Sequence, residues 1–391
     1  MVGIGNFKQV QVDISSLHIS PPHTNVDADI PVDSTLFPKI TGKIPELVQN
    51  YIHKNRVPPT TPDDKTVVIV PGTPTQIPMI GTVKLHGTHA DIVINPDDTI
   101  RIQSRNRLSL GLGDGRDNYG VAEHLIPLRQ NLLQLRDLVL ARFKELNPDG
   151  QVSKDHPVII AGEWVGPGVQ KGVALARLKT KLFVVISIAV NNKWVPDELF
   201  SKIEDVDAGI VHISRGGFFS EVLQIRDIED CQKRMMEHTM AVEKECPFSK
   251  SFGVSGVGEG IVWKSAHPLG EDTRFWVKTK GPLHRVSNTD ELKKAPPTAN
   301  ADEVEKARAF AQAAVTEMRL QQGWDHLGEM GIERDMKAVP RMMKWVCDDV
   351  MIEEKMKMEE LGVDKKSLRK AVGEMARDWF LKRLGEGADR E

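Results

Sequence analysis

The sequence predicts an α+β protein in which a β-rich part is followed by a helical C-terminal domain. Runs of strand-forming residues dominate positions 67 to about 285. One helical pattern interrupts them, because residues 121–146 carry leucines at positions 125, 128, 132, 135 and 138, close to the α-helical period. Beyond residue 300 the pattern is helical almost to the end. Strands followed by a block of helices are typical of α+β proteins.

The expected elements fall into three regions. Residues 1–30 form an N-terminal extension in which residues 10–14 alternate like a short strand. A domain at 31–294 follows, with helices expected at 44–54, 121–146 and 221–245. Its β-rich runs lie at 67–70, 90–94, 99–105, 157–165, 181–190 and 260–264. The Pro-Pro pair in KKAPPTANADE marks a linker near residue 295. A helical domain at 300–391 has helices expected at 301–322, 335–358 and 365–384.

The composition is that of a folded protein, with 40% hydrophobic and 27% charged residues. A net charge of -3 argues against a strongly basic nucleic-acid coat protein, but it allows an enzyme that concentrates positive charge in one cleft. The three cysteines are widely spaced, which disfavours a disulfide framework or a zinc site. With no secretory signal and no run of about 18 apolar residues, we expect no membrane association. The expected location is intracellular, in cytoplasm or nucleus, with an organelle left open, and the oligomeric state is also left open.

A lysine followed by His-Gly stands at a strand-to-strand turn in VKLHGT, residues 83–88. Taken alone, Lys84 is more often an exposed turn residue than a nucleophile. A nucleophilic lysine needs neighbouring cations or desolvation, because its ordinary pKa is about 10.4. Gly87 would let the backbone turn tightly beside a bound nucleotide. His86 and His89 could each be polar surface residues.

Three more candidates lie at or near strand ends. Arg105 or Arg107 in QSRNR either faces solvent or offers a planar donor fork to phosphate or sugar oxygens. Glu163 in AGEWVGPG is either a turn residue or a carboxylate that points into a cleft. Phe183 opens the apolar run that follows, where core packing and base stacking both fit it.

Residues 258–264 and 274–281 add a carboxylate and two lysines. GEGIVWK approaches a Walker A motif but lacks its second glycine and its helix, so we reject a P-loop. Glu259, between two glycines, suits a hard cation such as Mg²⁺. In RFWVKTKG, strand alternation places Lys278 and Lys280 on one face. They either lie on an exposed edge strand or neutralise a triphosphate and lower the pKa of a nearby Lys84.

Taken in order, KLHGT, SR, GEW, FVVISI, EGIVWK and KTKG resemble motifs I, Ia, III, IIIa, IV and V of the covalent nucleotidyltransferase superfamily. The histidine of KLHGT, where DNA ligases usually have KxDG, resembles the RNA ligase 2 family, and RDNYG at 116–120 is similar to the segment that follows motif Ia there. The resemblance covers roughly residues 36 to 285. It implies a nucleotidyltransferase domain of antiparallel sheets with flanking helices, followed by a helical C-terminal domain.

The resemblance also implies an ATP-dependent RNA ligase. Lys84 would be the catalytic residue that carries AMP, and Glu259 would act at a Mg²⁺ or Mn²⁺ ion. Nucleotide binding would fall to His86, Gly87, Arg105, Glu163, Phe183, Lys278 and Lys280. Within that set, Arg105 and Glu163 would contact the sugar or phosphate, and Phe183 would stack on adenine. The partners would be ATP and RNA with 5′-phosphate and 3′-hydroxyl ends, with any end-healing left to separate enzymes.

The sequence departs from the family pattern in two places. Val83 stands where a glutamate often helps to read the adenine, so base choice would depend on backbone groups. The C-terminal part shows no oligonucleotide-binding barrel pattern and no motif VI. A DNA ligase or a GTP-dependent capping-type enzyme would be favoured by KxDG and a β-rich C-terminal barrel, neither of which is visible. A non-catalytic nucleic-acid-binding relative, or AMP transfer to something other than RNA, are further alternatives.

Overall fold

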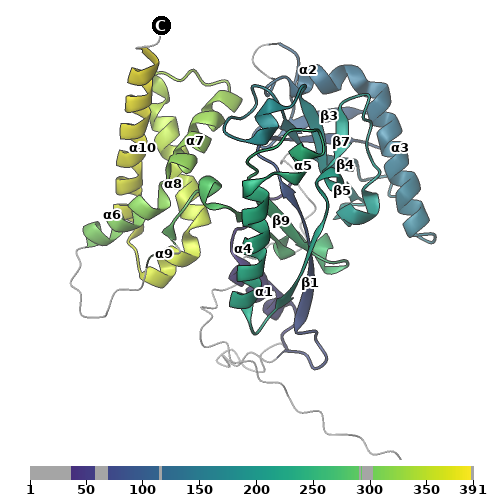
Figure 1. Cartoon of the computed structure of the whole chain (residues 1–391), viewed down its shortest axis with the longest axis horizontal. Coiled ribbons are helices and arrows are strands. Elements are labelled where there is room, and N and C mark those ends of the chain that lie inside the picture. Colours follow the sequence, from purple (N-terminus) through teal and green to yellow (C-terminus); the bar gives the residue numbers. More distant parts are fainter. Residues whose placement is uncertain (1–36, 58–68, 114–116, 290–291, 293–302, 389–391) are drawn as a thin grey trace, which may run out of the picture. The chain divides into compact units, whose positions relative to one another are not determined.

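The computed structural model describes residues 37–57, 69–113, 117–289, 292 and 303–388 (Figure 1). The chain divides into two compact units, the first ending at Gly281 and the second comprising residues 113–118 and the chain from Pro282 onward. The predicted extension at 1–30, with its short strand at 10–14, lies outside the described residues, and so does most of the expected linker near residue 295.

The first unit contains two sheets, and the smaller one carries the strand that ends at Lys84. Its strand order is β10–β9–β1–β8, and every neighbouring pair is antiparallel. The strands are β1 (Gln76–Lys84), β8 (Phe219–Gln224), β9 (Gly260–Ser265) and β10 (Trp276–Lys280). Alternation sends Met79, Val83 and Trp263 to the face that packs on α1 (Ile44–Lys54) and α4 (Ile228–Lys244).

The larger sheet has the order β3–β2–β4–β5–β6, with β7 beside β5. Its strands are β2 (Thr88–Ile94), β3 (Ile100–Ser104), β4 (Val158–Val165), β5 (Leu182–Val190), β6 (Lys193–Trp194) and β7 (Ile210–His212). One face packs on α2 (Val121–Leu125) and α3 (Arg129–Leu146). On the other face, Ile159 and Ala161 pack with Trp276 of β10, so this face meets the smaller sheet.

In the first unit, the helices expected at 121–146 and 221–245 have different bounds. The helix at 121–146 is broken by a 3₁₀ turn at Ile126–Leu128, because Pro127 cannot donate a helical hydrogen bond. The helix expected at 221–245 begins only at Ile228, after Asp227, whose side chain accepts a hydrogen bond from Asp230 N. Its first expected residues belong to β8, because Phe219–Gln224 alternates and pairs with β1. A short α5 (Pro247–Lys250) follows α4.

The second unit is built from helices around one core. They are α6 (Glu303–Ala314), α7 (Glu317–Glu329), α8 (Val339–Glu353), α9 (Lys355–Leu361) and α10 (Lys365–Ala388). The expected helix at 301–322 is split where Thr316 caps α7, with its hydroxyl accepting from Arg319 N. Arg319 is itself buried between Asp349 and Glu354, at 3.0 Å from each. No helix among the described residues is long and apolar enough to span a bilayer.

Antiparallel sheets with flanking helices, followed by a helical C-terminal part, confirm the predicted fold class. The strands at 90–94, 99–105, 157–165, 181–190 and 260–264 all appear within a residue or two of their expected ends.

Candidate active site

Strand register brings two lysines to opposite sides of one glutamate. Lys84 ends β1 and pairs with Gly260 of β9, and Gly260 pairs in turn with Lys280 of β10. A Cβ at Gly260 would collide with the Thr279 carbonyl oxygen, so glycine is needed for the close approach of β9 and β10 here. The residue before it is Glu259. Its carboxylate lies 2.7 Å from Lys84 Nζ and 2.8 Å from Lys280 Nζ. Three segments far apart in the sequence thus meet at one carboxylate.

The charge of Glu259 is set by these neighbours. The residue is 2% exposed, and burial alone would raise the pKa of its carboxyl group. Lys280 and Lys84 outweigh that effect, with a contribution from His86, whose Nδ1 lies 3.4 Å from Oε2. The pKa of Glu259 therefore lies well below its ordinary value, so the residue is a carboxylate at neutral pH.

The turn after β1 is anchored to β4 by Glu163. Gly87 N donates to Glu163 Oε1 at 3.1 Å, and Gln170 Nε2 donates to Gly87 O at 3.4 Å. A side chain at position 87 would collide with β4, since its Cβ would lie 2.8 Å from both Glu163 Cγ and Val165 Cγ1. Burial raises the pKa of Glu163, and the positive charges of Lys84 and other neighbours offset this only in part. The predicted Gly87 and Glu163 are thus in direct contact, one turn from Lys84.

The remaining predicted cations lie around this centre. Arg105 is exposed in the turn after β3, and its charge acts on the pKa of Glu163. Lys278 is two residues before Lys280 on β10, and alternation places both on the face of the sheet that carries Lys84.

Phe183 occupies a different place from the one the resemblance implies. Its ring is 0% exposed and lies against Gly162 in the core beneath α2 and α3. It pairs with Trp164, and successive residues alternate faces, so it points away from the face of Glu163. The structure gives this ring no exposed surface on which a base could stack, which corrects the implied role and supports core packing.

Ile186 lies on the other face of β5. Phe183 and Val185 both belong to the core beneath α2 and α3, so alternation places Ile186 on the side of the smaller sheet. The register shift between Ala161 and Gly162 leaves Ile186 with no directly opposite residue on β4. Ile186 and Val262 of β9 are both partly buried against the cluster that joins the two sheets. Because both faces of β5 are buried, the run FVVISI shows no polar alternation that separates Phe183 from Ile186, and the sequence did not single out Ile186.

A family model described as RNA ligase matches residues 77–280, just over half of the chain, and contains every predicted site residue. The chain belongs to the RNA ligase family.

Among solved structures, this RNA ligase family member is similar to Naegleria gruberi RNA ligase. The structure with PPi shows 16% identity and a TM-score of 0.37, covering 68% of this chain and 62% of that one. A lysine-to-alanine variant with ATP and Mn shows 17% identity and a TM-score of 0.34, covering 65% and 62%. This chain therefore spans less than two thirds of the length of these ligases. No curated protein sequence matches.

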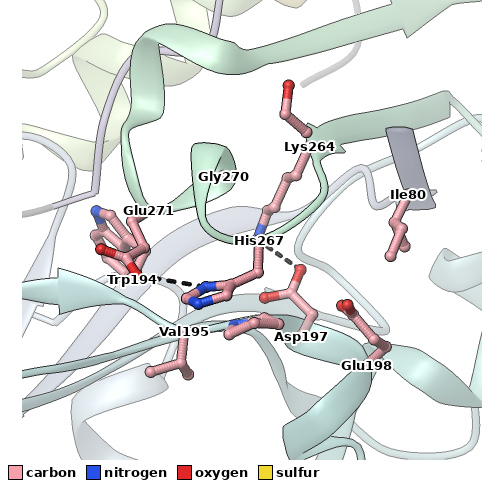
Figure 2. Close-up of a pocket in the computed structure, with 11 residues that line it drawn as sticks. Ile80, Trp194, Val195, Asp197, Glu198, Lys264, His267, Gly270 and Glu271 are labelled. Atoms are coloured by element: carbon pink, nitrogen blue, oxygen red, sulfur yellow. Dashed lines mark hydrogen bonds and ion pairs between the residues drawn. The ribbon is translucent and has the colours of Figure 1, made fainter. Parts of the chain in front are cut away.

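A fourth lysine on the same sheet face belongs to a separate hollow. Figure 2 shows Lys264 of β9 reaching Asp197, with Nζ 2.6 Å from Oδ2, beside Trp194, His267 and Glu271. Burial lowers the pKa of Lys264 and raises that of Asp197, although each charge favours the other. The ammonium also donates to Ser187 Oγ and lies 4.1 Å above the Trp276 ring. Because Asp197 neutralises it, Lys264 adds no free charge to the Lys84 centre, and its place in a strand agrees with rejecting a P-loop.

Glu259 is the described carboxylate best placed to hold a divalent cation at this centre. Among the described residues, no group of three or more His, Cys, Asp and Glu could enclose a metal. Mg²⁺ is usually held by one or two carboxylates together with substrate phosphates and water. A single buried carboxylate between two lysines therefore fits a cation that arrives with a polyphosphate.

Proposed function

We propose that this protein is an ATP-dependent RNA ligase that forms a covalent lysyl-AMP at Lys84. The observation that carries the proposal is the set of Lys84, Lys280 and Glu259 in direct contact within the segment that matches the RNA ligase family. A lysine nucleophile needs a neighbouring positive charge and a site for the phosphates, and this arrangement supplies both.

Each side chain around Lys84 has a role in the proposal. Lys278 and Lys280 bind the phosphates of ATP, while Arg105 and Glu163 contact the sugar or the α-phosphate. Gly87 holds the turn after Lys84, and His86 contacts the Glu259 carboxylate that positions Lys84. Adenine lies between the apolar side chains of Ile186 and Val262, which replace the Phe183 ring. A divalent cation at Glu259, Mg²⁺ or Mn²⁺, supplies charge stabilisation for the transferring phosphoryl group when bound.

The proposed reaction has three steps. Lys84 is held in an ion pair with Glu259, and the amine must leave this pairing and lose its proton before it attacks. Lys84 Nζ then bonds to the α-phosphorus of ATP and pyrophosphate leaves. AMP passes to the 5′-phosphate of an RNA end, which frees Lys84. The 3′-hydroxyl of a second end attacks that phosphate, forms the phosphodiester and expels AMP.

The proposal assigns the chemistry and the choice of substrate to different parts of the chain. We place the chemistry in an adenylation domain at 31–294, and we assign substrate choice to the extension at 1–30 and the helical domain at 300–391. Enzymes that generate 5′-phosphate and 3′-hydroxyl ends would act separately.

A labelling experiment tests the proposal. The protein is incubated with α-labelled ATP or GTP and Mg²⁺ and resolved on a denaturing gel. We expect label from ATP, removed by pyrophosphate, absent in Lys84→Ala and unchanged in the exposed control Lys366→Ala. Label from GTP alone would favour a capping-type enzyme. If folded protein takes up no label from either nucleotide, the proposal that it is a covalent nucleotidyltransferase is excluded.

The substrate is tested in a second stage. Adenylylated protein is offered 5′-phosphorylated RNA and DNA, each as nicked duplex and as single strands. We expect loss of protein label and sealed product with RNA ends, and no sealing when the 5′ end is a hydroxyl. Sealing of DNA in preference to RNA would contradict the assignment.

A further inference from the structure

A row of buried polar side chains continues the site along the larger sheet. In the antiparallel register of β2, His89 lies directly opposite Glu163, and Asp91 lies opposite both Ala161 and Gln103. Directly opposed residues share one face of a sheet, with Cβ atoms about 5 Å apart. His89, Asp91 and Gln103 therefore stand on the face of Glu163, although they are 6%, 0% and 0% exposed.

The imidazole of His89 is held in one orientation. Its Nε2 lies 2.8 Å from Asp91 Oδ1, and Phe37 stacks on the ring with centroids 4.8 Å apart. Because a carboxylate can only accept, Nε2 carries the proton of this hydrogen bond. The other nitrogen of a neutral imidazole is then an acceptor. A ring fixed by a carboxylate on one edge and an aromatic on one face is preorganised to present Nδ1.

The row lacks partners for several atoms. Among the described residues, nothing bonds to His89 Nδ1, Asp91 Oδ2 or either amide atom of Gln103. Buried polar atoms are nearly always paired, because leaving one unpaired forfeits its hydration with nothing in return. Most of these open atoms are acceptors. The row is therefore complementary to a ligand group that brings hydrogen-bond donors, such as hydroxyl groups, to the side of the sheet that carries Glu163.

We propose that His89, oriented by Asp91, accepts a hydrogen bond from a ribose hydroxyl of ATP and makes the enzyme select ribonucleotides. The proposal rests on the proposed function, in which Glu163 contacts the nucleotide sugar. His89 lies directly opposite Glu163 in the register of β2 and β4, so the two side chains address the same part of a ligand. His89 is a positioning residue for the nucleotide, and Asp91 acts through it.

The test compares ATP with 2′-deoxy-ATP and 3′-deoxy-ATP. The rate of lysyl-AMP formation is measured against nucleotide concentration for the wild type, His89→Ala, His89→Gln and Asp91→Asn. We expect the wild type to use ATP about tenfold better in kcat/KM than one of the two analogues, and that analogue identifies the hydroxyl. In His89→Ala the ratio falls to about one because ATP loses its advantage. His89→Gln, which keeps an acceptor, restores part of it.

Asp91→Asn provides a variant that keeps the packing. An asparagine amide can donate to Nε2, which moves the ring proton to Nδ1 and removes the acceptor, so the preference for ATP falls while the melting temperature stays close to that of the wild type. The control is His267→Ala, a half-exposed histidine beside the separate hollow, and it should leave the ratio unchanged.

The possible outcomes distinguish a failure of this inference from a failure of the proposed ligase function. If the wild type forms lysyl-AMP but discriminates against neither analogue, the inference is wrong and the ligase proposal stands. The same holds if His89→Ala and Asp91→Asn slow all three nucleotides equally, because that is the result of a purely structural pair. If folded wild-type protein forms no adduct with ATP, both proposals fail together.

Discussion

Replacing Gly87 with alanine should disable the proposed nucleophile through a collision that the structure defines. The new Cβ would lie 2.8 Å from Glu163 Cγ and Val165 Cγ1, and closer still to the Trp164 carbonyl oxygen. That oxygen belongs to β4, which is paired on both sides, with β2 and with β5, so it cannot swing aside. The turn that carries Lys84 must move instead. Overpacking of this kind costs about 1–3 kcal/mol, and a displacement of about 1 Å at a reacting group costs about a hundredfold in rate.

The assay measures lysyl-AMP formation and thermal unfolding on the same samples. We expect Gly87→Ala to label about a hundredfold more slowly, while its melting temperature falls by about 4–8 °C for a loss near 2 kcal/mol. The matched control is Gly111→Ala, whose Cβ would meet nothing within 4 Å. Labelling of Gly87→Ala at the wild-type rate would refute the steric argument, and an equal loss in Gly111→Ala would show that any glycine change in this region has the effect.

Three further predictions concern stability. Arg319→Ala removes the buried guanidinium that contacts both Asp349 and Glu354 and should destabilise the helical unit by about 3–5 kcal/mol. Arg377→Ala breaks an exposed pair and should cost under about 1 kcal/mol, and equal shifts in urea midpoints would contradict this. Burial, with the charge of Lys264, lowers the pKa of His212 to about 4. In the unfolded chain His212 has a pKa near 6.5, so as the pH falls the unfolded state binds the proton before the folded state does. The free energy of unfolding, fully present above pH 6.5, therefore falls by about 3 kcal/mol toward pH 4. His212→Asn keeps an acceptor for Ser214 N and should flatten that slope in urea titrations, and an unchanged slope would exclude His212 as its source. Phe183→Leu should lower the melting temperature but leave the KM for ATP unchanged, and a raised KM with normal stability would restore the stacking role.

The residue pattern was sufficient for many elements of the fold. Runs of strand-forming residues located β2, β3, β4, β5 and β9, and alternation placed Lys278 and Lys280 on one face of β10. The strand that carries Lys84, β1 at Gln76–Lys84, was not among the expected runs. Motif order was sufficient for the RNA ligase family, which the match over residues 77–280 confirms. Helix ends were predicted less well, since Pro127 broke one helix and pairing with β1 converted the start of another into β8.

The sequence by itself determined which residue types are available and which face of a strand each occupies, and these follow from local geometry. Only the tertiary structure decided which of them meet. Glu259 joins Lys84 and Lys280 through the register of three strands. The packing of the two faces of β5 decided that Phe183 lies in the core beneath α2 and α3 while Ile186 lies on the side of the smaller sheet. The sequence allowed His89 to be a surface residue, because a turn motif does not show that the Phe37 ring stacks on it or that Asp91 bonds to it. Contacts between distant segments depend on how sheets pair and pack, and this is the physical reason that a single sequence leaves them open.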